Sequence, residues 1–267
     1  MTSLPDIESD LALAHRLADA AAAETLPRFR AVDLVADNKA QDGFDPVTAA
    51  DKAAEAAIRA VLAKERPDDA VFGEEEARRP GRSGRTWVID PIDGTRGFVS
   101  GIPLWTTLIA LDDGIRGVLG VVDQPYIGER FVGCLIGPTG AQLHRGGLPA
   151  TIATRRAERL SDATLMTTDP ALFSEVETPR FEAVRTACRL TRYGADGYGY
   201  ALLAAGQIDL VIESGLSAYD IAAPKVVVEA AGGVVTGWTG GDCRWGGQVL
   251  AAATPRLHAQ ALAMLTG

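Results

Sequence analysis

The segment WVIDPIDGTRGF, residues 87–98, constrains the fold most, because an apolar strand runs directly into acidic residues. Asp90 and Asp93 stand three residues apart, and Gly94 and Thr95 follow at once. Two carboxylates this close repel each other unless a positive charge lies between them. Oxygen ligands of this kind suit a hard cation such as Mg²⁺. The segment therefore predicts a buried strand that ends in a metal site, then a tight turn and a helix.

A metal site at a strand end, followed by a helix N-terminus, indicates phosphate chemistry. One carboxylate can bridge two cations about 3.5 to 4 Å apart, an arrangement used in many phosphate-transferring enzymes. Gly94 allows a tight turn before a helix that is predicted to begin at Thr95, and backbone N–H groups at the start of a helix can bind phosphate oxygens. The segment thus predicts hydrolysis of a phosphate ester by a metal-activated water.

A covalent mechanism is the main chemical alternative. Some phosphatases attack with an Asp at the end of a strand, and a second Asp follows two residues later. Asp90 and Asp93 are separated by three residues, which does not match that arrangement. The spacing therefore favours direct attack by water over an aspartyl-phosphate intermediate.

Composition and charge exclude several other classes of protein. A chain of 267 residues with 47% hydrophobic and 23% charged residues can bury the core of one large domain or two closely packed ones. The net charge of -9 disfavours a nucleic-acid surface. The most apolar run, 104–111, is too short to cross a membrane, and the first residues do not resemble a signal peptide. We expect a cytoplasmic protein whose scattered cysteines bind no metal.

The hydrophobic pattern changes along the chain and predicts two halves. Helical periodicity marks residues 4–21 and a second helix from about Thr48 to Arg66. Short β-rich runs between residues 105 and 144 predict an antiparallel meander. Strands and helices then alternate to the end of the chain. We therefore predict an N-terminal α+β half at 1–150, which carries most metal ligands, and a C-terminal α/β half at 151–267, which completes the metal and substrate site.

Further acids lie at predicted strand ends or helix starts, in the segments VFGEEE, DPVTAAD and SAYDIAA. Each has a purely structural alternative. Asp51 follows Thr48 by three residues, as in a capping box. Asp220 could cap the helix that it opens, with Pro224 in the first turn, and Glu74 could belong to a solvated turn.

Four segments together resemble the signatures of the inositol monophosphatase family, in order and over nearly the whole chain. They are DPVTAAD, GEE, WVIDPIDGT and YDIAAPKVVVEAAGG. The resemblance implies an α/β protein with a layered αβαβα sandwich fold, usually a homodimer. It also implies a phosphatase that needs two or three Mg²⁺ ions, for which Mn²⁺ can substitute.

The same resemblance implies a role for individual residues. The phosphate is held by Gly94 and Thr95, and the attacking water is oriented or activated by Asp51 and Thr95, with Glu74 also catalytic. The implied metal ligands are Glu74, Asp90, the carbonyl of Ile92, Asp93 and Asp220.

The residues that follow the central motif resemble the histidinol-phosphatase branch of this family. Arg96, the segment GIPLWTTLIAL and the segment RYGADGYGYALLAAGQIDLVIESGLSAYDIAA carry this resemblance. It implies hydrolysis of histidinol phosphate in histidine biosynthesis. That substrate carries an ammonium group, and Asp196 or Glu213 could pair with it. Asp196 could equally be a turn residue and Glu213 a solvated acid at a strand end.

Two other functions stay open at this point. The protein could hydrolyse inositol 1-phosphate or another small sugar phosphate. It could also be a regulator that binds metal or phosphate without turnover. Every implied ligand is present, whereas a regulator that had lost activity would be expected to lack at least one.

Overall fold

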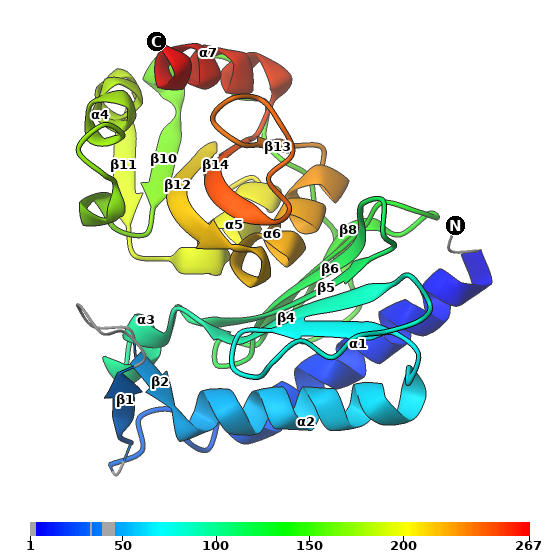
Figure 1. Ribbon diagram of the computed structural model, residues 1–267. Coiled ribbons are helices and arrows are strands. Elements are labelled where there is room, and N and C mark those ends of the chain that lie inside the picture. Colours follow the sequence, from blue (N-terminus) through cyan, green and yellow to red (C-terminus); the bar gives the residue numbers. More distant parts are fainter. Residues whose placement is uncertain (1–3, 33, 39–45) are drawn as a thin grey trace.

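The computed structural model describes residues 4–32, 34–38 and 46–267, and Figure 1 shows its layers in the order helix, sheet, helix, sheet, helix. One helix pair covers the outer face of the first sheet, a second pair lies between the sheets, and a third covers the second sheet. This is the predicted αβαβα sandwich. The pairs are α1 (Leu4–Thr25) with α2 (Ala49–Glu65), α5 (Asp196–Ala204) with α6 (Ala218–Ala230), and α4 (Thr178–Ala187) with α7 (Pro255–Thr266).

The first sheet has seven strands in the order β3-β4-β5-β6-β7-β8-β9. β3 and β4 are parallel, and every later neighbour is antiparallel, which confirms the predicted meander. The strands are β3 (Ala70–Gly73), β4 (Thr86–Asp93), β5 (Thr106–Asp112), β6 (Gly117–Gln124), β7 (Glu129–Cys134), β8 (Gly140–His144) and β9 (Ala150–Thr151).

The second sheet has five strands in the order β11-β10-β12-β14-β13. β10 is parallel to both its neighbours, and β14 is antiparallel to both of its own. The strands are β10 (Thr164–Thr167), β11 (Leu190–Tyr193), β12 (Leu210–Ser217), β13 (Val234–Thr236) and β14 (Gly246–Ala252). The short elements are β1 (Ala36–Asn38), β2 (Pro46–Thr48), α3 (Thr95–Val99), η1 (Leu160–Asp162) and η2 (Pro170–Leu172). The two sheets fall on either side of the predicted division near residue 150, and that division stays a prediction.

Two glycines let α6 lie directly on the first sheet. Gly120 on β6 pairs with Gly133 on β7, so the two form a bare patch on one face. A Cβ at Gly133 would lie 2.5 Å from the Cα of Val227, and one at Gly120 would lie 2.5 Å from the carbonyl oxygen of Ala223. Any side chain at these positions would force the helix away from the sheet. The glycines therefore fix the position of α6, and with it Asp220 near the helix start.

Pro224 lies deeper in α6 than predicted. The helix begins at Ala218, two residues before Asp220, so Pro224 is an interior residue and the prediction of a first-turn proline was wrong. A proline has no N–H, so the carbonyl of Asp220, four residues earlier, receives no helical hydrogen bond from it.

Among the described residues, no helix combines the length and the apolar character needed to cross a membrane.

We expect Gly133→Ala to lower the free energy of unfolding by about 1–3 kcal/mol, the usual cost of overpacking a core, because its methyl group would overlap the backbone of α6. Gly147→Ala is the matched control, since a Cβ at Gly147 would have no atom within 4 Å. Urea denaturation measures both. Equal stability of the two variants would show that α6 does not depend on this close contact.

Candidate active site

A β-bulge turns Asp90 and Asp93 toward the same side of the sheet. Asp90 pairs with Leu108 and Asp93 pairs with Thr106, so three steps along β4 match two steps along β5. Side chains alternate between the faces of a strand, and residues three apart would normally point in opposite directions. The extra residue of the bulge cancels that alternation. The spacing of the two acids is thus explained by the backbone that carries them.

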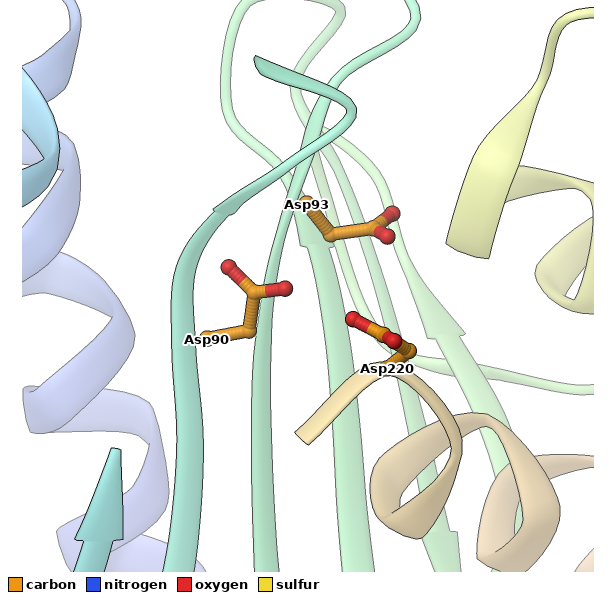
Figure 2. A group of neighbouring side chains, drawn as sticks. All are labelled: Asp90, Asp93 and Asp220. Atoms are coloured by element: carbon orange, nitrogen blue, oxygen red, sulfur yellow. The ribbon is translucent and has the colours of Figure 1, made fainter. Parts of the chain in front are cut away.

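The third member of the cluster comes from the other half of the chain. Figure 2 shows Asp220, at the start of α6, facing Asp90 and Asp93 of β4. Each contributes one carboxylate oxygen to a group whose members all lie within 4.8 Å of one another. Asp90 and Asp93 are buried, at 1% and 9% exposure, and Asp220 is partly buried.

Each of these aspartates is held in place through one of its own oxygens. Asp90 Oδ1 accepts a hydrogen bond from the backbone N–H of Ile92 at 3.0 Å. Asp220 Oδ2 accepts from the N–H of Ser217 at 2.6 Å in a capping box whose N-cap is Ser217, so the alternative in which Asp220 itself caps the helix was wrong. Asp93 Oδ2 accepts from the Thr106 hydroxyl at 2.9 Å and from the N–H of Gly197 at 2.6 Å. Gly197 lies on α5, so this contact joins the two halves at the site.

The electrostatics of the cluster fit a cation. Burial raises the pKa of Asp90 well above its ordinary value, and the charges of Glu74, Asp93 and Asp220 raise it further. Burial likewise raises the pKa of Asp93, with Asp196 and Asp220 adding to the effect. Buried acids that repel one another are stabilised by positive charge, and oxygen donors suit hard divalent cations. The residues present therefore fit the metal that the sequence implies.

Glu74 lies beside Asp90, and a buried acid on α2 holds its loop. Glu74 lines the same cavity and forms a hydrogen bond with Asp90. The fully buried Glu55 accepts hydrogen bonds from the N–H groups of Glu75 and Glu76 at 2.8 and 3.0 Å. Arg59 pairs with Glu55 at 2.7 Å and donates to the carbonyl of Glu76. The GEEE segment is thus a fixed loop rather than a solvated turn.

Asp51 does not line the cavity and contacts the site through Thr95. It forms the predicted capping box, with its Oδ2 accepting from the Thr48 N–H and hydroxyl at 2.7 and 2.6 Å. Its Oδ1 lies 3.3 Å from the hydroxyl of Thr95. The Thr95 hydroxyl also lies 2.9 Å from the carbonyl oxygen of Ile92. Burial raises the pKa of Asp51, despite the lowering effect of its hydrogen bonds with Thr48.

Gly94 forms the turn between β4 and α3 and packs against the opposite half. Its φ of 84° is in the left-handed region that favours glycine. A Cβ there would also lie 3.2 Å from a carboxylate oxygen of Asp196. α3 spans only five residues, so the N–H groups of this turn, rather than a long helix, are available to a phosphate.

A cavity of about 350 Å³ connects these groups with the two acids predicted to bind substrate. Asp196 is the first residue of α5, and burial raises its pKa to about 6, although the nearby Arg96 lowers it. Glu213 is 3% exposed rather than solvated, and burial raises its pKa to about 7. The cavity lining includes Glu74, Asp90, Ile92, Asp93, Gly94, Thr95, Asp196, Glu213 and Asp220. Of the predicted site residues, only Asp51 stands outside this lining, joined to it through Thr95.

Several contributors were not predicted from the sequence. Thr168 donates to Glu213 Oε1 through its N–H at 2.7 Å and through its hydroxyl at 3.0 Å. Thr106, Glu55 and Tyr200 also belong to the site or its support. Nothing in the local sequence marks these residues, since their roles depend on strands and helices that are distant along the chain. Only the buried acid Glu55, one helical turn after Asp51, could have been suspected from its place on the same face of α2.

Comparison with known proteins identifies the family of the chain. The model of the inositol monophosphatase family matches residues 6–266. A histidinol-phosphatase of Streptomyces coelicolor is 39% identical and covers 98% of this chain and 98% of its own. The bifunctional phosphatase IMPL2 of Arabidopsis thaliana, a chloroplastic protein, is 39% identical over 99% of this chain and 78% of its own length.

Solved structures agree with these matches. An inositol monophosphatase from Zymomonas mobilis superposes with a TM-score of 0.85 at 42% identity, covering 97% of this chain and 98% of its own.

We expect Asp90→Asn, in the presence of a chelator, to be more stable than the unchanged protein at about pH 8. Burial raises the pKa of Asp90 in the folded protein, so folding favours the protonated form of this side chain. The folded state therefore loses stability as the pH rises through that pKa and Asp90 ionises. Asn carries no charge and can still accept from the Ile92 N–H. The difference should shrink as the pH falls toward about 4, the ordinary pKa of Asp. Urea denaturation across this range would reject the account if the variant were the less stable protein at alkaline pH.

Proposed function

The chain belongs to the inositol monophosphatase family and is a phosphoric monoester hydrolase, and we propose that its substrate is histidinol phosphate and its cofactor Mg²⁺. Members of the family act on small phosphorylated molecules and are generally metal-dependent. One observation carries the substrate proposal: the cavity holds two acids, Asp196 and Glu213, beyond those of the metal cluster. Their negative charge suits a phosphate ester whose organic part is cationic.

Glu213 is well placed to receive an ammonium group. Its carboxylate is fixed by the hydroxyl of Thr167 at 3.1 Å and by Thr168, so it is oriented before any ligand binds. Burial makes ionisation of Glu213 unfavourable, with a pKa of about 7, and a cationic ligand beside it would offset that cost. Asp196 contributes less charge on its own because Arg96 lies near it. The 39% sequence identity to the histidinol-phosphatase of Streptomyces coelicolor supports the same substrate.

In this proposal the metal is held by Glu74, Asp90, Asp93, Asp220 and the carbonyl of Ile92. Divalent cations in such a site supply positive charge to the phosphoryl group and promote the ionisation of water. The hydrogen bonds to the carboxylate oxygens of these aspartates hold the side chains in place, so the site need not reorganise when substrate binds. The N–H groups at Gly94 and Thr95, which line the same cavity, hold phosphoryl oxygens.

Asp51 and Thr95 orient the attacking water. The Thr95 hydroxyl donates to Asp51 or to Ile92, which leaves its oxygen to accept a hydrogen bond from water. The raised pKa of Asp51 makes its carboxylate a better base than an exposed Asp, so it can take up a proton that passes through Thr95. Glu74 lies near Asp90 in the same cavity and contributes to polarising the water.

The remaining details are predictions of the same proposal. They are two or three Mg²⁺ ions for which Mn²⁺ can substitute, a homodimer, a cytoplasmic location and a role in histidine biosynthesis. Inositol 1-phosphate or another small sugar phosphate is the alternative substrate, since the Zymomonas mobilis structure is that of an inositol monophosphatase. A regulator without turnover is set aside, because the family and the relatives above place the chain among hydrolases.

With Mg²⁺ present, we expect a higher kcat/KM for histidinol phosphate than for inositol 1-phosphate, and no activity after chelation. Glu213→Gln and Asp196→Asn should each lower kcat/KM for histidinol phosphate by about tenfold to a hundredfold, the value of a charge-assisted hydrogen bond. Phosphate release measured side by side on both esters gives the comparison.

Inositol 1-phosphate is the internal control, because a neutral polyol has no ammonium group to lose. Glu182→Gln, on the surface of α4 and paired with Arg185, should change neither substrate. Equal losses on both esters would assign Asp196 and Glu213 a general supporting role. A preference of the unchanged protein for inositol 1-phosphate would remove the histidinol proposal and leave the phosphatase.

Single-turnover hydrolysis in ¹⁸O-labelled water tests the proposed nucleophile. Direct attack places the label on the released phosphate and forms no phosphorylated enzyme, as mass spectrometry of phosphate and of the Asp90 peptide from acid-quenched samples can show. Water that attacks the phosphorus of an aspartyl-phosphate would also label the phosphate, so a phosphorylated Asp90 peptide is the result that would demonstrate the covalent route.

A further inference from the structure

Tyr200 lines the active-site cavity, and its buried hydroxyl has no hydrogen-bond partner among the described residues. Tyr200 is 2% exposed, and its hydroxyl oxygen is buried. It belongs to α5, where it lies one turn after Asp196, and both residues line the cavity. Residues four apart share one face of a helix, so this face of α5 is turned toward the site.

An unpartnered hydroxyl in this position needs an explanation. Leaving a buried donor unsatisfied destabilises a folded protein, and buried polar side chains are as a rule hydrogen-bonded. A phenylalanine would fill the same space without that cost. Other hydroxyls of the site are already engaged: Thr106 donates to Asp93, and Thr167 to Glu213. Tyr200 therefore stands apart from the residues that only support the acids.

The surroundings of the phenol are those of a substrate contact. Burial raises the pKa of Tyr200, and the nearby Glu213, Cys243, Asp93 and Asp220 raise it further, so the phenol keeps its proton. Glu213 exerts the largest of these charge effects, and it is the acid proposed to bind the organic part of the ester. A protonated phenol offers one donor and one acceptor to a polar ligand group in the same place.

The neighbouring Tyr198 provides the structural contrast. It lies two residues earlier on α5, and its hydroxyl donates to Glu129 Oε2 at 2.6 Å, on β7. Its ring packs edge-on against Phe131, outside the residues that line the active-site cavity. One helix thus carries two tyrosines: the hydroxyl of Tyr198 is hydrogen-bonded within the protein, whereas Tyr200 lines the cavity and its hydroxyl has no partner among the described residues.

We propose that Tyr200 is a specificity-determining residue whose hydroxyl forms a hydrogen bond with a polar N–H or O–H group on the organic part of the substrate, beside Glu213. The inference rests on the proposed phosphatase function but not on which ester is preferred. In this proposal Tyr200 contacts the organic part of the ester alone, and neither the phosphoryl group nor the attacking water. Its contribution therefore depends on the leaving group of the ester.

The test compares Tyr200→Phe with Tyr198→Phe in the full-length chain with Mg²⁺. Each is assayed on the better of histidinol phosphate and inositol 1-phosphate, and on phenyl phosphate, whose leaving group has no polar hydrogen. We expect Tyr200→Phe to lower kcat/KM for the polar ester by about threefold to tenfold and to leave phenyl phosphate unchanged. Its melting temperature in chelator should rise, by on the order of 2 °C, because an unsatisfied hydroxyl has been removed.

Tyr198→Phe should behave in the opposite way, with a lower melting temperature and unchanged kcat/KM on both esters. Unchanged activity of Tyr200→Phe on the polar ester would overturn the proposal. So would equal losses on the polar ester and on phenyl phosphate, since these would place the hydroxyl on the phosphoryl group or the water. If the unchanged protein hydrolysed none of the esters, the proposed function would fail instead, and the melting temperatures alone would show whether Tyr200 carries an unsatisfied hydroxyl.

Discussion

Repulsion between buried carboxylates is the constraint on which the rest of the structure depends. Asp90, Asp93 and Asp220 each place a carboxylate oxygen within 4.8 Å of the others, and burial raises the pKa of Asp90 and of Asp93. The acids stay together because hydrogen bonds from neighbouring parts of the chain hold each of them in place. Backbone N–H groups hold one oxygen of each aspartate, and Glu55 on α2 holds the loop of Glu74. A folded protein that concentrates negative charge in this way is prepared for a cation.

Each of the two sheets has a β-bulge in the strand that carries acids of the site. The register of β4 shifts between Asp90 and Asp93, and that of β12 shifts between Glu213 and Leu216. A bulge redirects side chains at the end of a strand, which is why bulges gather next to active sites. The first bulge aligns two acids of the cluster, and the second lies directly after Glu213, the acid proposed to bind the organic part of the substrate. The glycine pair beneath α6 then fixes the distance between the two halves.

The sequence allowed the fold and most of the site to be predicted because the relevant signals are local. Hydrophobic periodicity marked α1 and α2, and the meander followed from short apolar runs between turns. The acids of the DPIDGT segment were recognisable from their mutual repulsion alone. The strand β11 was missed, because its LTRY segment is short and mostly exposed and lies at the sheet edge.

What could not be predicted depends on contacts between distant segments. The bulge that reconciles the spacing of Asp90 and Asp93 is set by pairing with β5. The interior position of Pro224 is different, because Ser217 and Asp220 have the spacing of a capping box and mark the helix start at Ala218, whereas the prediction placed that start at Asp220. The role of Tyr200, like that of the bulge, is invisible in the sequence, since Tyr198 has the same side chain in the same helix. The two tyrosines differ only in the structure, where the Tyr198 hydroxyl is hydrogen-bonded to Glu129 and the Tyr200 hydroxyl has no partner among the described residues.

The most direct test of the central claim is a crystal structure of the protein grown with Mn²⁺, with the ions located by anomalous diffraction. The account predicts anomalous peaks within coordination distance of the carboxylates of Asp90, Asp93 and Asp220, with Glu74 turned toward one of them. Anomalous peaks held only elsewhere on the molecule, in crystals of a protein that hydrolyses phosphate esters, would contradict it.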